Sequence, residues 1–391
     1  SIPHYVQASK YFVVLAPCVK HVDTGDLMSK ESWQSRGWCR VERVCREFLC
    51  PDSNIAVIES TQHWYVMTPF DSWLRPACMG QFTVESDRDK VQCLIAEMLR
   101  TKLVSCVKNS QLQMYRMVLN LQHVYMRKTR LGIERTRSTK SLVVGDELQL
   151  PHFMKQNGFE SATEYQFGWS PACFAALRGH AQVMKELLAG RANVNDTVKA
   201  HEKSFHIEKG MSLLMICAQF CNNVCMRLLI EQRADLNFRD SLGCTALHRA
   251  GIGDNSEGLQ ILLEAGCNPY RLDTFGNNAL VPSCSWGSVH SIRTLIAHVP
   301  DIDIGAALHF AVFGEGAPEE TIPELLLAGV DINAPMPLSR KMRLQFRLLA
   351  RVAKWLDRRH GTHLFFFLTN VIGATPLIIS LLSRSFHAAA I

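Results

Sequence analysis

Cysteine and histidine are the residues of this chain best suited to metal or redox chemistry, and their spacing argues against both. The sequence has 14 cysteines and 15 histidines among 391 residues, but no Cys-x-x-Cys pair, so a structural zinc site is not expected. His360 and His363 flank a glycine without acidic or cysteine neighbours, and we predict no bound metal or cofactor. Several cysteines fall on helical faces that call for small apolar residues: Cys173, Cys217, Cys221, Cys225 and Cys284. Such unpaired cysteines are typical of a reducing compartment, so we expect a cytoplasmic location.

One carboxylate lies in a distinctive segment, although no phosphate-binding loop, nucleophile elbow or zinc-protease motif occurs. It is Glu42, in the segment Trp38-Cys39-x-x-Glu42. If this segment is an ordinary helix, Glu42 lies on its exposed face and pairs with Arg46 one turn later. Trp38 and Cys39 would then be core residues.

Positive charge is concentrated in one segment. The chain carries +6 overall, but residues 340–359 alone carry +7, so the remainder sums to −1 and no nucleic-acid-binding surface is expected. At 100° per residue, six basic side chains form one stripe: Arg340, Arg343, Arg347, Arg351, Lys354 and Arg358. Apolar residues fall on the opposite side, which predicts a basic amphipathic helix. It could bind an acidic partner, an anionic membrane surface or a calmodulin-like clamp, or it could pack on the protein by its apolar face with its arginines solvated.

An uncharged stretch follows this segment. Residues 364–382 contain no charged side chain across 19 positions, which is long enough for a membrane span. However, Gly373-Ala-Thr-Pro-Leu377 reads as the start of a short helix, with Pro376 in its first turn. We favour a helix buried between neighbouring helices, and a membrane span is the alternative.

A regular repeat organises the second half of the chain. Gly210, Gly243 and Gly276 are equally spaced, and each opens the same pattern of residues. The clearest copy reads Gly243-Cys-Thr-Ala-Leu-His-Arg-Ala250, followed by Ile261-Leu-Leu-Glu-Ala-Gly-Cys-Asn268. This pattern and its period resemble the ankyrin repeat. The resemblance implies pairs of helices stacked into a solenoid, with an extended surface for binding other proteins.

Six copies can be traced in this register. They begin near Gly168, Gly210, Gly243, Gly276, Ile304 and Gly373. In the fourth copy Pro282 is expected to disturb the first helix. The sixth copy stops at Ile391, inside its second helix, so we expect the chain to be a fragment of a longer protein.

The resemblance also implies where partners bind and what the repeat histidines do. Binding is expected at the inner helices and at hairpin tips exposed between repeats: Phe238, Arg239, Asp240, Arg271 and Asp273. His180, His248 and His309 occupy framework positions where the imidazole bonds the turn backbone.

Residues 1–60 read as an α/β unit. An apolar run at 11–17 predicts a buried strand, helical spacing follows over 31–48, and residues 54–58 predict a second strand. Together with Ser35-Arg-Gly-Trp-Cys-Arg-Val-Glu42, this unit resembles part of a Toll/interleukin-receptor domain. In enzymatic members the corresponding glutamate helps break the nicotinamide–ribose bond of a dinucleotide. The resemblance therefore implies that Glu42 stabilises an oxocarbenium-like centre or binds ribose hydroxyls.

The sequence thus predicts a mainly α protein: an ankyrin-repeat solenoid preceded by a partial α/β unit and a helical connector. The predicted boundaries are 1–60 for the α/β unit, 61–150 for the connector, 151–333 for repeats 1–5, 334–372 for a basic insertion and 373–391 for the truncated repeat. In the connector we expect irregular structure over 61–85, helices from Ser86 and over 112–125, and a basic linker at 127–140. We predict a protein-interaction scaffold. The alternatives are a repeat-regulated NAD-cleaving enzyme and the cytosolic region of a membrane protein.

Overall fold

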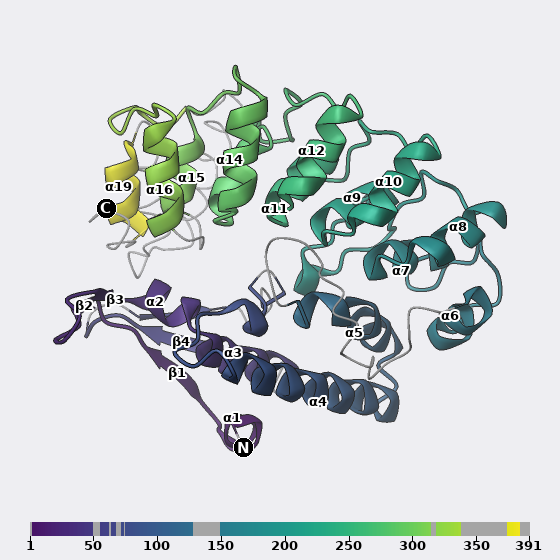
Figure 1. The fold of residues 1–391 in the computed structure, drawn as a ribbon, viewed down its shortest axis with the longest axis horizontal. Helices are drawn as coiled ribbons and strands as arrows, with labels where there is room; N and C mark the ends of the chain where they lie inside the picture. The colour runs from purple at the N-terminus through teal and green to yellow at the C-terminus, as the bar shows by residue number, and fades with distance from the viewer. Residues whose placement is uncertain are drawn as a thin grey trace, which may run out of the picture. The chain divides into compact units, whose positions relative to one another are not determined.

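The computed structural model describes residues 2–49, 55–61, 64–67, 72–73, 75–127, 149–313, 318–337 and 374–383 (Figure 1). The chain divides into two compact units. Unit 1 consists of Ser1–Asn193 with Val198–Ile207, and unit 2 of Val194–Thr197 with Glu208–Ile391. The first helix-pair repeat therefore belongs to unit 1 and the later ones to unit 2.

Unit 1 begins with a short helix and a small mixed sheet. After α1 (Ile2–Ala8), the sheet has the strand order β1 (Phe12–Leu15), β4 (Ile55–Ile58) and β5 (Trp64–Met67). Strands β1 and β4 are parallel, and β5 pairs antiparallel with β4. The connection from β1 to β4 contains the hairpin β2 (Val19–Lys20) and β3 (Leu27–Met28), then α2 (Lys30–Ser35) and α3 (Gly37–Leu49). The predicted strand, helix, strand order is present, with the helix divided in two.

The prediction of irregular structure over residues 61–85 is wrong in one part. Trp64–Met67 form β5, and η1 (Ala77–Met79) is a single 3-10 turn. Strand β5 is short and is defined by its pairing with β4, a partner that local sequence does not reveal. The prediction that the first strand is buried is also only half correct, because Val14 is buried while Val13 and Leu15 are exposed.

The core of unit 1 combines one sheet face with a layer of helices. Strand residues Val14, Ile55 and Val57 cluster with Ala16, and Phe12 and Trp33 pack against them. Helix α3 packs on α1 and on α4 (Asp87–Lys108), which in turn packs on α5 (Leu112–Tyr125). The predicted helix at 112–125 has the bounds expected. The predicted basic linker lies outside the described residues from 128 onward.

The first helix-pair repeat completes unit 1. It consists of α7 (Pro171–Arg178) and α8 (Ala181–Ala189); α5 packs on α7, and the predicted short helix, α6 (Leu150–Asn157), packs on α8. Helix α7 starts where the sequence predicts, because the Ser170 hydroxyl accepts the Cys173 N–H at 3.3 Å and Pro171 occupies the first helical position. The 3-10 turn η2 (Lys203–Phe205) follows in a longer loop.

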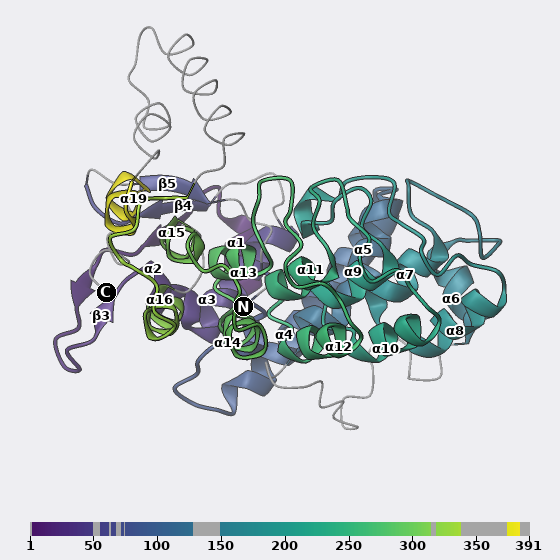
Figure 2. The ribbon, with the colours of Figure 1, turned by 90° about the horizontal axis from the view of Figure 1, so that it is seen from above.

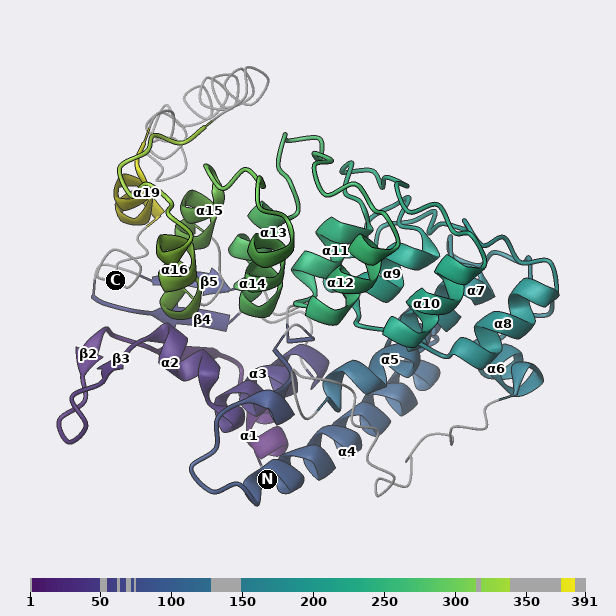
Figure 3. The same ribbon diagram turned by 45° about the horizontal axis from the view of Figure 1, so that its top comes forward.

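Unit 2 repeats the helix pair. The pairs are α9 (Leu213–Gln219) with α10 (Asn223–Glu231), α11 (Ala246–Ile252) with α12 (Ser256–Glu264), α13 (Leu280–Ser285) with α14 (Val289–His298), and α15 (Ala307–Phe313) with α16 (Pro318–Leu327); α19 (Pro376–Ser383) opens the sixth repeat. First helices pack on first helices and second on second, as Figure 3 shows. In Figure 2 the helices α10, α12 and α14 form an outer row, α9, α11 and α13 form an inner row, and loops extend beyond the inner row.

Pro282 shortens its helix without preventing it. Helix α13 starts at Leu280, so Pro282 occupies the third position of the first turn. Backbone N–H groups in a first turn have no intrahelical acceptor, and a proline there loses nothing. In the described parts of the chain, no helix has both the length and the apolar character needed to cross a membrane.

Candidate functional site

Two hairpin loops project between the helix pairs of unit 2 and contain most of the predicted binding residues. We define the first hairpin as residues 238–244 and the second as residues 270–277. Each turns on a glycine with positive φ, 75° at Gly243 and 88° at Gly276. At Gly243 a side chain would also clash, since a Cβ would lie 2.9 Å from the Thr274 nitrogen.

The aspartate of the first hairpin is not part of the surface, contrary to the sequence prediction. Asp240 is only 7% exposed. Its Oδ1 accepts the backbone N–H groups of Leu242 and Cys244 at 2.9 and 3.0 Å. Its Oδ2 accepts the Arg249 Nε–H at 2.8 Å and a second hydrogen bond from the same guanidinium. Asp240 is therefore a structural residue that fixes the hairpin to helix α11.

The aspartate of the second hairpin has a similar role. Asp273 is half-buried. Its Oδ1 accepts the N–H groups of Phe275 and Asn277 at 2.8 and 2.9 Å. Asp240 is thus neutralised by Arg249 of α11, whereas Asp273 keeps its negative charge and is held in place by N–H groups of its own loop.

The two predicted arginines do lie at the surface. Arg239 and Arg271 are exposed, and Phe238 is half-buried. Arg239 also connects the hairpins, because its Nε–H donates to the Gly243 carbonyl at 3.1 Å and its terminal nitrogen donates to the Leu272 carbonyl at 2.8 Å. This connection holds the two hairpins in a defined spacing.

The sequence analysis did not predict that three apolar residues of the second hairpin belong to the surface. Tyr270, Leu272 and Phe275 are 56%, 48% and 44% exposed. The repeat register could have indicated two of them, because Leu272 and Phe275 align with Arg239 and Leu242 of the preceding hairpin tip. We call Arg239, Tyr270, Arg271, Leu272 and Phe275 the hairpin surface. It combines exposed apolar side chains with two positive charges.

The inner helices do not add to this surface. Every residue of α9 and of α11 is buried. The hairpins are thus the accessible part of these repeats, and binding at the inner helices stays a prediction.

The repeat histidines make the backbone bonds that their positions predict. His248 Nε2 lies 3.1 Å from the Asn277 carbonyl, and His309 Nε2 lies 3.0 Å from the Ala334 carbonyl. His180 Nδ1 accepts the Val183 N–H at the start of α8. Burial lowers the pKa of His248 and of His309. Within the described residues, no group of three or more His, Cys, Asp or Glu side chains could hold a metal ion.

The predicted basic stripe, Arg340 to Arg358, lies outside the described residues, but the chain on either side of it is placed. The Met336 N–H donates to the Ala374 carbonyl at 2.9 Å. The same closing bond joins Asp240 to Cys244 at 3.1 Å and Asp273 to Asn277 at 2.8 Å. The residues on either side of the insertion are thus joined by the same kind of bond that closes each of the first two hairpins.

Glu42 lies on α3 in a half-buried position. Burial raises the pKa of its carboxyl above the ordinary value, and the nearby Arg36 charge acts against this effect. The predicted pairing of Glu42 with Arg46 is wrong. Arg46 is buried, and its guanidinium donates to the carbonyls of Val6, Ser9 and Lys10. Arg46 thus bonds a segment that is distant in sequence, and local sequence does not reveal this partner.

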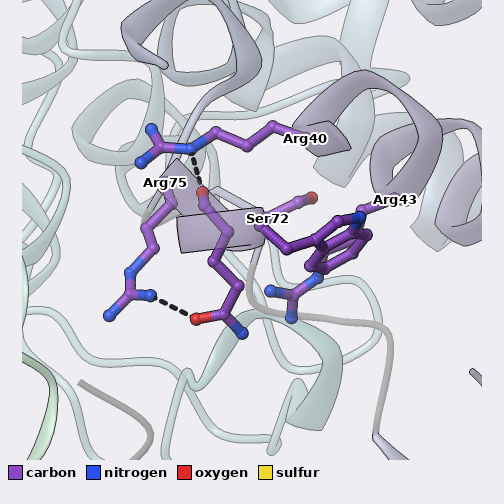
Figure 4. A pocket seen from close by; sticks show the side chains of 6 residues that line it. Arg40, Arg43, Ser72 and Arg75 are labelled. Carbon is purple, nitrogen blue, oxygen red and sulfur yellow. Dashed lines mark hydrogen bonds between the residues drawn. The ribbon is translucent and has the colours of Figure 1, made fainter. Parts of the chain in front are cut away.

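A pocket of unit 1 contains three arginines but not Glu42. It is lined by Trp33, Gln34, Arg40, Arg43, Ser72 and Arg75 (Figure 4). Arg40 Nε–H donates to the Gln34 carbonyl at 2.6 Å, and an Arg75 terminal nitrogen donates to Gln34 Oε1 at 2.7 Å. Behind the pocket, the buried Glu47 accepts hydrogen bonds from Arg43 and Ser72. Burial raises the pKa of Glu47 to about 7, although Arg43 and Ser72 oppose the shift. Arg40 and Arg75 thus both bond Gln34 of α2, and Arg43 bonds Glu47 on its own helix.

Comparison with known proteins identifies the helix pairs. The family model for three copies of ankyrin repeats matches residues 196–273, and the model for a single ankyrin repeat matches residues 167–199. The chain is 31% identical to the NF-kappa-B inhibitor alpha of Gallus gallus over 146 residues, which are 35% of this chain and 43% of the relative. It is 31% identical to the human transient receptor potential cation channel subfamily A member 1 over 151 residues, 38% of this chain and 13% of the channel. It is 27% identical to the inversin of Canis lupus familiaris over 175 residues, 43% of this chain and 15% of inversin.

These matches show that the chain contains ankyrin repeats, as the sequence predicts. The chain spans less than half the length of each of these relatives. The Toll/interleukin-receptor resemblance at residues 1–60 receives no support, because the family models match only within residues 167–273.

Proposed function

We propose that this ankyrin-repeat protein is a non-enzymatic interaction scaffold that binds other proteins through its hairpin surface. The observation that carries the proposal is the exposure of Tyr270, Leu272 and Phe275 on one short hairpin. Exposed aromatic and arginine side chains at a rigid position are the residues that contribute most to protein interfaces. Arg239 supplies the rigidity by bonding the backbone of both hairpins.

The charge of the hairpins favours an acidic partner. Asp240 is buried and paired with Arg249 and Asp273 is half-buried, whereas Arg239 and Arg271 are exposed. The predicted basic stripe, Arg340 to Arg358, lies in sequence between Met336 and Ala374, which are bonded to each other in unit 2. A partner segment with carboxylates around one or two apolar side chains would complement this combination.

The cysteines support a cytoplasmic location as part of the proposal. The 13 cysteines that the structure describes are all free thiols. The chicken relative is named as an inhibitor of NF-kappa-B. By analogy, this chain would act by holding or masking its partner. The alternative of a NAD-cleaving enzyme has no observation in its favour, since Glu42 does not line the arginine pocket.

The proposal can be tested by reversing the character of the hairpin surface. In the double variant Tyr270→Glu and Phe275→Glu, binding of the natural partner should weaken by at least about 2 kcal/mol, because two apolar anchors are lost. The matched control is Val224→Glu, on outer helix α10, where the valine is 64% exposed. Quantitative affinity purification should recover partners with the wild type and the control but not with the double variant. Equal recovery with all three chains would refute the hairpin surface as the binding site.

A further inference from the structure

The sheet of unit 1 has one face made entirely of apolar residues in two regular rows. Strand pairing places Val13, Ala56 and Val66 side by side in one row. The same pairing places Leu15, Ile58 and Trp64 side by side in the next row. Because successive strand residues point to opposite faces, all six lie on the face opposite the buried residues Val14, Ile55 and Val57. We call these six residues the open sheet face.

The open sheet face is accessible to solvent. Leu15 is 72% exposed and Trp64 is 65% exposed, while Val13 and Val66 are each about half exposed and Ala56 and Ile58 are partly covered. Both faces of a parallel α/β sheet are normally covered. The six side chains expose on the order of 500 Å², which is as large as the largest apolar patches on typical monomers. Such a patch indicates an interface.

We propose that a second copy of this chain covers the open sheet face, so that two sheets pack face to face. The six residues carry no charge, and the indole N–H of Trp64 is their one side-chain hydrogen-bonding group, so little in them selects a different, complementary surface. The row with Leu15 and Trp64 is bulky, and the row with Val13 and Ala56 is small. A twofold axis running between the two rows, in the plane of the interface, places the bulky row of each copy over the small row of the other.

This arrangement is self-complementary in volume. It sets Leu15 over the partner's Val13, Ile58 over the partner's Ala56 and Trp64 over the partner's Val66, so each large side chain faces a smaller one. Each large side chain then meets a smaller one across the interface, which suits sheets packed at about 10 Å. An isologous contact of this kind closes at the dimer and does not continue into a fibre.

The size of the patch sets the expected strength. Two copies would bury on the order of 1,000 Å² in total, which is at the low end of specific interfaces. We therefore expect a reversible dimer that forms in the micromolar concentration range. The contact lies on unit 1 and does not involve the hairpin surface, so the two proposals succeed or fail independently.

The test is sedimentation velocity of the 391-residue chain over about 1–100 µM. We expect the wild type to shift from monomer to dimer in this range, and Trp64→Lys and Leu15→Lys to weaken dimerisation at least tenfold. The matched control is Val107→Lys on α4, where the valine is 64% exposed. This control should dimerise like the wild type. Thermal unfolding followed by circular dichroism should be unchanged in all three variants, because each altered side chain is exposed.

A second variant tests the arrangement of the rows. Ala56→Phe places a large side chain where the partner's Ile58 must fit, so it should also weaken the dimer, whereas Trp64→Phe should largely retain it. A wild type that stays monomeric at 100 µM would overturn the proposal. So would lysine variants at Trp64 and Leu15 that dimerise as well as the Val107 control.

Discussion

The helix pairs of unit 2 and the sheet of unit 1 distribute polar and apolar residues in opposite ways. In the repeats, apolar side chains fill the inner helices and the buried ion pair of Asp240 and Arg249 joins residues only nine positions apart. In unit 1, six apolar side chains form an open face, while Arg46 is buried and bonds carbonyls 36 to 40 positions away.

The difference reflects how each region is stabilised. A repeat buries its apolar face against the next repeat, so its environment is set by neighbours at a fixed spacing. The sheet of unit 1 depends on contacts between distant segments, and it leaves one face for another molecule. Changes in the repeats should therefore act on stability, whereas changes on the open sheet face should act on association.

The largest effect is expected from Asp240→Ala. The substitution leaves the Arg249 guanidinium buried without its carboxylate and removes the acceptor of two hairpin N–H groups. Breaking a buried ion pair in this way should lower the free energy of unfolding by about 3–5 kcal/mol. Urea denaturation measures the loss, and Glu231→Ala, at an exposed position on α10, is the control. A loss below about 1 kcal/mol would show that the pair is not needed to hold the hairpin.

A somewhat smaller effect is expected from Leu262→Ala, in the outer helix of the third repeat. Leu262 is fully buried, so its truncation should cost about 2–4 kcal/mol. The control is Leu327→Ala on α16, where the leucine is 85% exposed and the change should stay within about 0.5 kcal/mol. Equal effects at the two positions would contradict the assigned repeat register.

The third prediction concerns the pH dependence of unit 1. Burial raises the pKa of Glu47 from 4.5 to about 7, so the folded state holds this proton more tightly than the unfolded chain does. Its contribution to stability is complete below about pH 4.5 and is lost as the pH rises through about 7, with a slope of up to about 1.4 kcal/mol per pH unit. Glu47→Gln should therefore gain stability relative to the wild type between pH 5 and pH 8.

Chemical denaturation of both proteins at several pH values measures this difference. If the difference between wild type and Glu47→Gln does not change with pH, Glu47 has an ordinary pKa and its bonds with Arg43 and Ser72 outweigh its burial. In that case unit 1 would contain a buried ion pair comparable to that of Asp240 and Arg249, and the two regions would differ less than we infer.

The sequence alone determined most of the repeat region, because helix pairs, glycine turns and histidine bonds all follow from positions within one repeat or the next. It predicted Arg239 and Arg271 as surface residues, which the structure places at exposed positions. It did not reveal that Asp240 is buried, since the same residue type suits a turn whether its carboxylate faces water or an arginine.

Tertiary structure alone decided the arrangement of unit 1. The sequence indicated the parallel strands, but β5, the partners of Arg46 and the open sheet face all depend on segments far apart along the chain. An apolar strand pattern indicates that a side chain prefers burial, but it does not indicate which segment will cover that side chain. No described segment of the folded chain covers Leu15 or Trp64, because the helices α1 to α3 pack with the other face of the sheet or with each other.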